Sequence, residues 1–304
     1  MHLSSYPYVK KVEAFLSATF PYFVKTIDKR YEEFGEVWLA DFNEELEVFY
    51  GDDVSCLESA VKCYGSFALD SMKLQKRFDK MREYIPKKYS DVSQEVYLNR
   101  DYMFNSYLPA ILLSQYLWSH HYRGLQYFRN TFVDLLEERS ASFFCDVGIG
   151  TGFYSKELLR ALPAIRGRGY DISPFSLEHA GIMLDKWGSL GRYEFCQVDI
   201  VLERPENQSD CLICVEVLEH LEDPASFLQA LHALLRPGGI GFINAAINGP
   251  NVDHIYLYRG LEDVLKEVAS VGFEVLQSVE YFGYAGKGEE SVPSSGICFV
   301  QKRS

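Results

Sequence analysis

The stretch that decides the fold is FFCDVGIGTGFY, at residues 143–154. Its apolar first half predicts a strand that ends at Asp146, and three glycines at every second position lead into a helix. Glycines at such a turn permit a tight bend and let a ligand touch bare backbone. A dinucleotide-binding loop of the form G-x-G-x-x-G would need a glycine at 153, where this chain has Phe153. The loop therefore disfavours a nicotinamide or flavin cofactor, and the plain alternative is an ordinary glycine-rich connection.

The residues that follow alternate between short β-rich runs and helical runs. Strands are expected at 143–147, 169–172, 193–198, 211–215, 240–245, 273–281 and 297–301, and helices at 154–162, 175–184, 224–235 and 260–271. This alternation predicts an α/β fold with a doubly wound, mostly parallel sheet. The last two strands have no helix between them, so a closing hairpin should add an antiparallel strand. The earlier residues carry helical patterns, which predicts an N-terminal helical region at 1–139 and an α/β domain at 140–304.

Acidic residues end three consecutive predicted strands. They are Asp146, Asp171, which comes 23 residues after Gly148, and Asp199. An acid at the end of the second strand of a nucleoside-binding α/β fold accepts hydrogen bonds from ribose hydroxyls. An acid after the third strand can accept from an adenine amine. Each alone is more typical of a solvated loop or a helix cap, but three on one rim of the sheet indicate a ligand site.

These residues, together with CVEVLEHL at 214–221 and LRPGG at 235–239, resemble the ordered motifs of class I S-adenosylmethionine-dependent methyltransferases. The chain is most similar to the small-molecule branch that includes the ubiquinone-biosynthesis O-methyltransferases, over about residues 140–302. The resemblance implies a seven-stranded sheet of order 3-2-1-4-5-7-6 with the last strand antiparallel. It also implies S-adenosylmethionine as cofactor, with its methionyl part against the glycine loop, its ribose on Asp171 and its adenine beside Asp199 and Ile200. The expected cofactor-binding residues in this part are Asp146, Gly148, Gly150, Gly152, Asp171, Ile172, Asp199, Ile200 and Glu216.

Histidines supply the candidate catalytic bases. His220 follows the fourth strand in Glu216-x-x-Glu219-His220, a spacing that puts the three side chains on one face of a helical turn. Some ubiquinone-pathway relatives hold a divalent cation with this pattern, whereas in others it packs and caps the turn, and we expect no metal here. His254 lies where a substrate-facing loop is expected after the fifth strand, and could equally be an ordinary loop histidine.

Aromatic residues are concentrated just before the glycine loop. The chain has 21 Tyr, 21 Phe and 3 Trp, and residues 97–128 are dense in them, as expected of a helical cap over the cofactor rim. Most should build helical core. Tyr102, Phe104 and Tyr107 precede Pro109 in an expected non-helical turn, so we favour them for cation–π contact with a sulfonium, and Tyr107 also for catalysis. In the apolar helix expected at 111–122, His120 or His121 could face the pocket or be exposed.

Composition limits the possible partners. The net charge of −13 argues against nucleic acid, because that binding depends on Lys and Arg at the phosphates. The first residues do not resemble a signal peptide, and no apolar run approaches the ~20 residues that span a bilayer. Seven cysteines at irregular spacing suggest no disulfide framework, and Cys211 and Cys214 lie in an apolar strand as small buried hydrophobes rather than a zinc or redox pair. We expect a cytoplasmic protein with a small-molecule substrate and no membrane partner; the sequence leaves the oligomeric state open.

Three functions remain in view. The first is in-line methyl transfer from S-adenosylmethionine to a small metabolite. The second is a lyase or cyclase in which the cofactor's own α-amine attacks its γ-carbon, giving azetidine-2-carboxylate and methylthioadenosine in an aromatic-capped site with no room for an acceptor. The third is a cofactor-binding subunit without activity. The glycine loop indicates which cofactor binds, whereas the aromatic-rich residues 97–128 should determine which carbon of that cofactor reacts.

Overall fold

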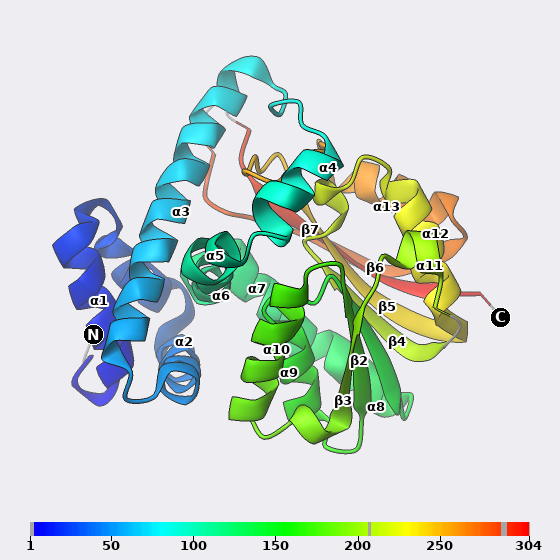
Figure 1. Cartoon of the computed structure of the whole chain (residues 1–304), viewed down its shortest axis with the longest axis horizontal. Coiled ribbons are helices and arrows are strands. Elements are labelled where there is room, and N and C mark those ends of the chain that lie inside the picture. Colours follow the sequence, from blue (N-terminus) through cyan, green and yellow to red (C-terminus); the bar gives the residue numbers. More distant parts are fainter. Residues whose placement is uncertain (1–2, 206–207, 287–290, 304) are drawn as a thin grey trace.

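The computed structural model describes residues 3–205, 208–286 and 291–303, and its centre is a seven-stranded sheet (Figure 1). The strands are β1 Phe143–Val147, β2 Arg166–Asp171, β3 Tyr193–Gln197, β4 Ser209–Val215, β5 Leu235–Ile247, β6 Phe273–Phe282 and β7 Ser294–Lys302. Their order is β3-β2-β1-β4-β5-β7-β6, with β7 antiparallel to β5 and β6 and the other neighbours parallel. The expected α/β class, strand order and closing antiparallel hairpin are confirmed.

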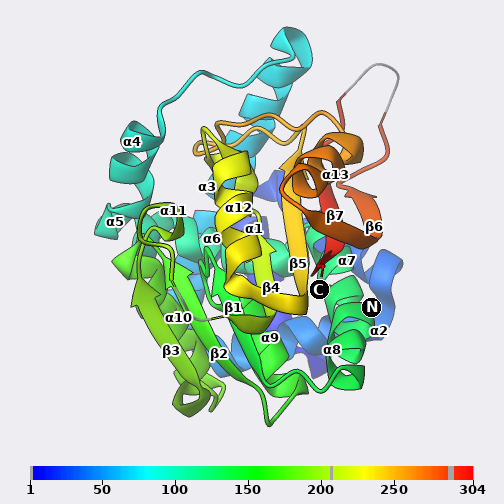
Figure 2. The same ribbon diagram turned by 90° about the vertical axis from the view of Figure 1, so that its right-hand side faces the viewer.

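Helices cover both faces of the sheet. The face turned to the viewer in Figure 2 carries α12 Pro224–Leu234 and α13 Leu261–Ser270, and the other face carries α9 Phe153–Ala161 and α10 Pro174–Lys186. Successive residues of β4 point to opposite faces, so Cys211 packs in one core and Leu212 in the other. Short helices follow β3 (α11 Ile200–Glu203), precede it (η6 Leu190–Arg192) and follow β4 (η7 Leu218–His220).

The residues before β1 form helices. The long ones are α1 Pro7–Thr19, α2 Lys25–Tyr50, α3 Val54–Met81, α6 Leu108–Leu117 and α7 Ser119–Tyr127, and the short ones are η1 Leu3–Ser5, η2 Pro21–Phe23, α4 Tyr89–Val92, η3 Ser93–Tyr97, α5 Arg100–Tyr102, η4 Met103–Tyr107, η5 Phe128–Phe132 and α8 Val133–Glu138. The helix α2 is kinked at Gly35, whose φ of 72° only glycine adopts readily. Three of the short elements, η3, η4 and η5, are π-helical turns.

Two local expectations about this region are wrong. Residues 102–107 are helical rather than a turn, because the π-helical turn η4 runs directly into α6 and Pro109 lies in the first turn of α6, where its missing N–H costs little. The helix expected at 111–122 is broken at Trp118, whose φ of −98° and ψ of 127° are those of extended backbone. The break turns the side chains after Trp118 in a new direction.

The helical region and the sheet share one hydrophobic cluster. It joins Trp38 and Phe42 of α2 to Phe144 of β1 and Phe242 of β5, all fully buried. The sequence-based division at residues 139 and 140 stays a prediction. The shared cluster means that the helices are packed onto the sheet as part of its core.

Buried ion pairs cross the same contact. The fully buried Lys156 of α9 lies 2.5 Å from Glu45 of α2 and also pairs with Glu157. Arg129 of η5 joins Glu157, at 2.6 Å, to Asp41 of α2, at 2.5 Å. Burial acts to raise the pKa of Glu157, but Lys156 and Arg129 hold it at about 2. The carboxylate therefore stays charged in this contact.

No helix among the described residues combines the length and the apolar character needed to cross a membrane. All seven cysteines are free thiols, and Cys211 and Cys214 are buried in β4 as expected.

Candidate active site

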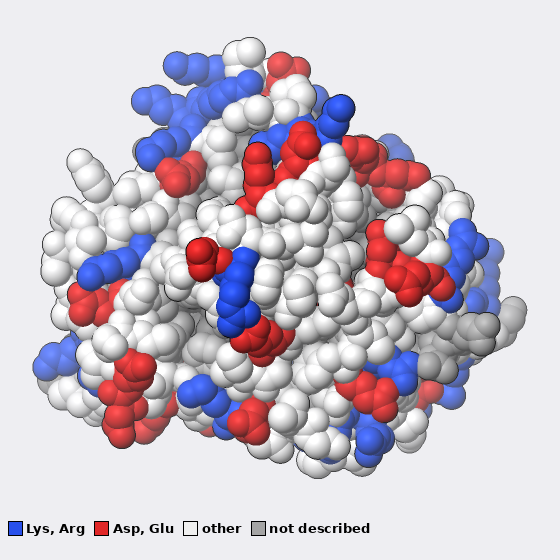
Figure 3. Space-filling view, in the orientation of Figure 1, with Lys and Arg blue, Asp and Glu red and all other residues white. Residues whose placement is uncertain are grey.

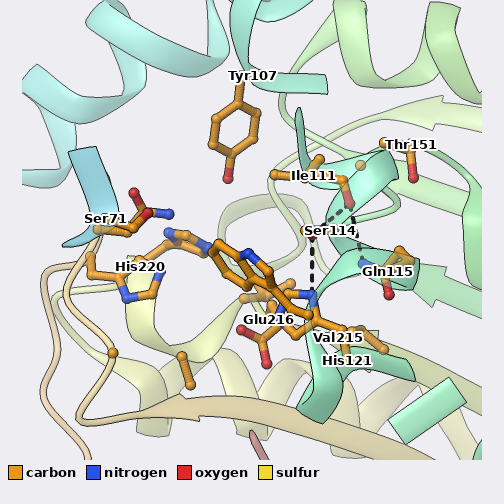
Figure 4. Close-up of a pocket in the computed structure, with 18 of the residues that line it drawn as sticks. Ser71, Tyr107, Ile111, Ser114, Gln115, His121, Thr151, Val215, Glu216 and His220 are labelled. Atoms are coloured by element: carbon orange, nitrogen blue, oxygen red, sulfur yellow. Dashed lines mark hydrogen bonds between the residues drawn. The ribbon is translucent and has the colours of Figure 1, made fainter. Parts of the chain in front are cut away.

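A cavity of about 940 Å³ lies at the carboxyl ends of the parallel strands, beneath the helical region (Figure 4). Eleven of the residues expected from the sequence line it: Asp146, Gly148, Gly150, Asp171, Ile172, Asp199, Ile200, Glu216, Tyr107, His220 and His254. Gly152, Tyr102 and Phe104 are not among its lining residues. The volume is near the upper end of ~300–1,000 Å³ for ligand pockets.

The glycine loop forms one wall of the cavity. Gly148, Gly150 and Gly152 all have positive φ, between 53° and 78°. A Cβ added at Gly152 would lie 2.8 Å from the Cβ of Ala180, so this glycine is required by helix packing. A Cβ at Gly150 would meet nothing nearer than 3.9 Å, so this glycine leaves open space at the cavity wall.

Two of the three rim carboxylates are tied to their surroundings in different ways. Asp146 accepts a hydrogen bond from Ser155 Oγ at 2.6 Å, and burial raises its pKa to about 7. Asp171 accepts from the backbone N–H of Ser173 at 2.8 Å and of Gly150 at 3.2 Å. Burial raises the pKa of Asp171 to about 6 in spite of these bonds. Asp171 is therefore a well-oriented, half-buried carboxylate that further donors would stabilise in its charged form.

The third carboxylate, Asp199, caps α11. Its Oδ1 accepts from the backbone N–H of Val201 at 2.9 Å and of Leu202 at 3.4 Å. The helix-cap alternative is therefore observed, and Asp199 lines the cavity at the same time. Ile200, which follows it, is buried against the sheet.

His220 is held by a residue that sequence reasoning missed. Its Nδ1 lies 3.2 Å from the backbone oxygen of Asp253 and 3.4 Å from Asp253 Oδ2. Donation from Nδ1–H to that carbonyl leaves Nε2 as a hydrogen-bond acceptor. Asp253 Oδ2 also accepts from Tyr107 at 2.6 Å and Tyr97 at 3.2 Å. In the sequence, only its position next to the candidate base His254 could have pointed to Asp253.

Two opposing effects set the charge of this fully buried carboxylate. Burial alone would raise the pKa of Asp253, but His220, His254 and the Tyr107 hydroxyl hold it below its ordinary value. Burial raises the pKa of the Tyr107 hydroxyl well above its usual range, so this residue is a hydrogen-bond donor rather than a base. Figure 4 shows Tyr107, Glu216 and His220 around one space.

Two glutamates adjoin this group. Glu216 has a φ of 54°, an uncommon conformation for a residue with a side chain and a form of strain typical of functional sites. Burial raises its pKa to about 7 and raises that of Glu219 further above the ordinary value. Neither Glu219 carboxyl oxygen has a hydrogen-bond partner among the described residues.

One set of side chains in the described part of the chain could hold a metal ion. The ligand atoms of Glu219, His220 and His254 lie within 4.8 Å of one another. Two imidazoles and a carboxylate are a donor set that binds zinc or other transition metals. Burial lowers the pKa of His254 to about 3, so its imidazole is neutral, as a metal ligand must be. The expectation of no metal stays a prediction.

The helical region contributes neutral histidines to the cavity. His120 and His121 both line it, and His121 Nδ1 lies 3.1 Å from Ser114 Oγ (Figure 4). Burial lowers the pKa of both, that of His121 to about 3. Because both line the cavity, neither matches the alternative of simple exposure.

Tyr102 and Phe104 lie elsewhere. Phe104 contacts the rings of Phe175 and His179 on α10, and Arg100 lies 4.7 Å from its ring centre. The ring of Tyr102 stacks beside that of Tyr107, with ring centres 6.3 Å apart, and Tyr102 is not among the residues that line the cavity. The expected contact of these two side chains with a sulfonium does not match their positions, because the π-helical turn directs them to α10 and to Tyr107.

Comparison with known proteins agrees with this geometry. Residues 145–240 match a family model described as a methyltransferase domain. A ubiquinone biosynthesis O-methyltransferase of Cupriavidus pinatubonensis (strain JMP 134 / LMG 1197) is 33% identical over 121 residues, which are 40% of this chain and 47% of that protein. The chain spans about half the length of the curated relatives it matches.

Solved structures share the fold. An O-methyltransferase family protein from Burkholderia thailandensis aligns with a TM-score of 0.52 at 14% identity, over 81% of this chain and 72% of that one. The N-methyltransferase NodS from Bradyrhizobium japonicum WM9, solved with S-adenosyl-l-homocysteine, aligns with a TM-score of 0.50 at 17% identity, over 71% of this chain and 98% of that one. The family model thus assigns residues 145–240 to a methyltransferase domain, and the sheet and its helices have the Rossmann-like fold of S-adenosylmethionine-dependent methyltransferases.

Proposed function

We propose that this chain transfers a methyl group from S-adenosylmethionine to a small-molecule acceptor. The observation that carries the proposal is the extent of the cavity. It runs from Asp171 and Asp199 at the sheet rim to Phe67 and Trp118 in the helical region. A cofactor held at the rim leaves the remaining volume for a second molecule, as transfer to an acceptor requires.

The residues at the rim fit the cofactor. The open space at Gly150 lets the methionyl part lie against bare backbone, and the half-buried Asp171 carboxylate suits the two ribose hydroxyls. One carboxylate oxygen of Asp199 caps α11, and the other oxygen would accept a hydrogen bond from the adenine amine. When bound, S-adenosylmethionine supplies an electrophilic methyl group on a cationic sulfur. Glu216 and the aromatic ring of Tyr107, which both line the cavity, favour a cationic sulfur next to them.

His220 is the proposed general base. His220 lines the cavity, and its Nε2 is left as an acceptor because Nδ1 donates to the backbone oxygen of Asp253. The Asp253 carboxylate, held by Tyr97 and Tyr107, stabilises the imidazolium that forms when Nε2 takes a proton from the acceptor. Positioning of the acceptor in line with the methyl group and removal of water supply the rest of the rate.

The lyase alternative requires a site closed over the cofactor alone. The volume of about 940 Å³ favours transfer to an acceptor over that alternative. Ubiquinone biosynthesis O-methyltransferases among the relatives support an oxygen atom as the methyl acceptor.

The deciding experiment is incubation of the purified protein with S-adenosylmethionine, with and without a library of small phenols, catechols and amines, followed by mass spectrometry. S-adenosylhomocysteine that forms only with an acceptor is the expected result. Methylthioadenosine formed without any acceptor would overturn the proposal in favour of the lyase. Binding without turnover in every mixture would favour an inactive binding subunit.

The cofactor site has its own test. Asp171→Asn should weaken S-adenosylhomocysteine binding in titration calorimetry, whereas Asp185→Asn, which changes an exposed carboxylate of α10, should not. Equal affinities of the two variants would contradict the assignment of Asp171 to the ribose.

A further inference from the structure

The end of the cavity farthest from the sheet contains a guanidinium group with an unused donor. Arg30 of α2 lines the cavity with its side chain 13% exposed. Its Nη1 lies 3.0 Å from Glu33 Oε2, and its Nε has no hydrogen-bond partner among the described residues. A buried N–H without a partner is costly, so this donor points to a group that the protein itself does not supply.

The only counter-ion in these contacts is shared. Glu33 Oε1 lies 2.8 Å from Nη2 and 2.9 Å from Nε of Arg123, while Oε2 serves Arg30. One carboxylate thus faces two guanidinium groups, which leaves about one positive charge in excess. Arg123 does not line the cavity, so Arg30 presents that excess charge to a ligand.

A flat wall leads from this group towards the cofactor rim. The rings of Phe67 and Trp118 stack at 5.7 Å and 23°, and those of Trp118 and His120 at 5.6 Å and 18°. All three line the cavity. Such a wall favours a planar, apolar body between the two ends.

Lysines outnumber acidic residues at the mouth of the cavity near α3, where Asp79 is the one lining carboxylate among the described residues of α2 and α3. Lys29 and Lys76 line the cavity at its exposed edge. Figure 3 shows Lys and Arg side chains gathered over the C-terminal half of α3, which carries Lys73, Lys76, Arg77 and Lys80. A basic patch on a chain of net charge −13 attracts anions locally.

The opposite end of the cavity is acidic, with Asp171, Asp199 and Glu216 at the rim. A cationic cofactor suits that end, and an anion suits the end at Arg30. We propose that the methyl acceptor is a planar, largely apolar molecule whose oxyanion group binds Arg30, with its nucleophilic atom at the other end near His220. This rests on the proposed methyl transfer and adds the class of acceptor.

The test uses two fluorescent probes with the same rings, 1-anilinonaphthalene-8-sulfonate and N-phenyl-1-naphthylamine, which lacks the sulfonate. With the protein saturated by S-adenosylhomocysteine, Arg30→Gln should weaken sulfonate-probe binding about tenfold or more, because a charge-assisted hydrogen bond is lost. Binding of the neutral probe should change less than about twofold. The control Lys62→Gln removes the same charge from an exposed part of α3 that lies outside the cavity lining and outside this basic patch, and should leave both affinities unchanged.

Arg30→Lys keeps the charge without the planar fork and should give an intermediate loss. Competition with 2-naphthoate and 2-naphthyl phosphate tests whether a carboxylate or a phosphate is the preferred oxyanion. The preferred group should displace the sulfonate probe at the lower concentration. Equal sulfonate-probe affinity in the wild type and Arg30→Gln, equal loss for both probes, or no displacement by either competitor would overturn the inference. Calorimetry with S-adenosylhomocysteine separates these outcomes from failure of the cofactor site, because that binding should be the same in the wild type and Arg30→Gln.

Discussion

The glycine loop allows backbone strain, packing overlap and ligand contact to be separated by single substitutions. Gly150→Ala and Gly188→Ala each place a Cβ on a residue with positive φ, 53° and 65° respectively. Neither new methyl group meets a protein atom nearer than 3.9 Å. Each should therefore lower the free energy of unfolding by about 1–2 kcal/mol, the cost of the left-handed conformation alone. Gly188 is the matched control because it lies outside the cavity lining.

Gly152→Ala adds overlap to the same backbone cost. Its Cβ would lie 2.8 Å from the Cβ and 2.9 Å from the Cα of Ala180, and backbone atoms of α10 have little room to move. Overpacking of this kind costs about 1–3 kcal/mol, so the total loss should be about 2–5 kcal/mol. Urea unfolding followed by circular dichroism measures all three variants.

Ligand binding distinguishes the three positions in a different order. The methyl group of Gly150→Ala would occupy the surface against which the methionyl chain is proposed to lie, so S-adenosylhomocysteine should bind about tenfold or more weakly. Gly188→Ala should bind it with wild-type affinity in titration calorimetry. If Gly150→Ala and Gly188→Ala bind equally well, the loop does not contact the ligand and the reasoning from the left-handed glycines is refuted.

Four further outcomes follow from the ionisable groups. S-adenosylhomocysteine affinity should fall as the pH is lowered through about 6, where Asp171 takes up a proton, and Asp171→Asn should flatten this dependence in calorimetry; an unchanged profile would contradict it. His220→Asn should slow methyl transfer by about 10²–10⁴-fold with cofactor binding unchanged, and a full rate would exclude His220 as the base. The pKa of Glu157 is about 2 in the folded state against an ordinary 4.5, so its ionised form should add about 3 kcal/mol to the free energy of unfolding above pH 4.5. This contribution should be lost as the pH falls towards 2, and urea unfolding should show the difference in stability between the wild type and Glu157→Gln closing over that range. Glu45→Gln should lower the free energy of unfolding by about 3–5 kcal/mol because it removes one partner of buried Lys156, whereas Asp70→Asn, in an exposed pair with Lys73, should cost less than about 1 kcal/mol.

The sheet and its rim could be predicted because their signals are local. The glycines, Asp171 and Asp199 each follow directly from an apolar run, and parallel strands bring their ends together without further information. The burial and hydrogen bonds of each acid depend on residues that are distant in sequence and so could not be predicted. Asp199, for example, both caps α11 and lines the cavity, and spacing alone does not separate these two roles.

The helical region was harder to predict because its geometry depends on irregular turns. A π-helical turn adds a residue to the helical ladder and rotates every later side chain. The turn at 103–107 sends Phe104 to α10 while Tyr107 reaches Asp253, which a regular helix or a loop would not predict. Arg30 and Asp253 escaped notice because each acts through partners that are distant in sequence or carry no motif.

The ion pairs that join the helical region to α9 have a consequence for how ligands enter and leave. A hinged opening of the helical region would separate Glu45 from Lys156 and Arg129 from Glu157, and would leave a fully buried ammonium group beside a single carboxylate. Loss of a partner in a buried pair costs about 3–5 kcal/mol, which would slow such an opening by a factor of hundreds or more. Ligand exchange should therefore proceed through the mouth beside α3 with the helices locked in place, and exchange rates should depend on side chains there rather than on a moving lid.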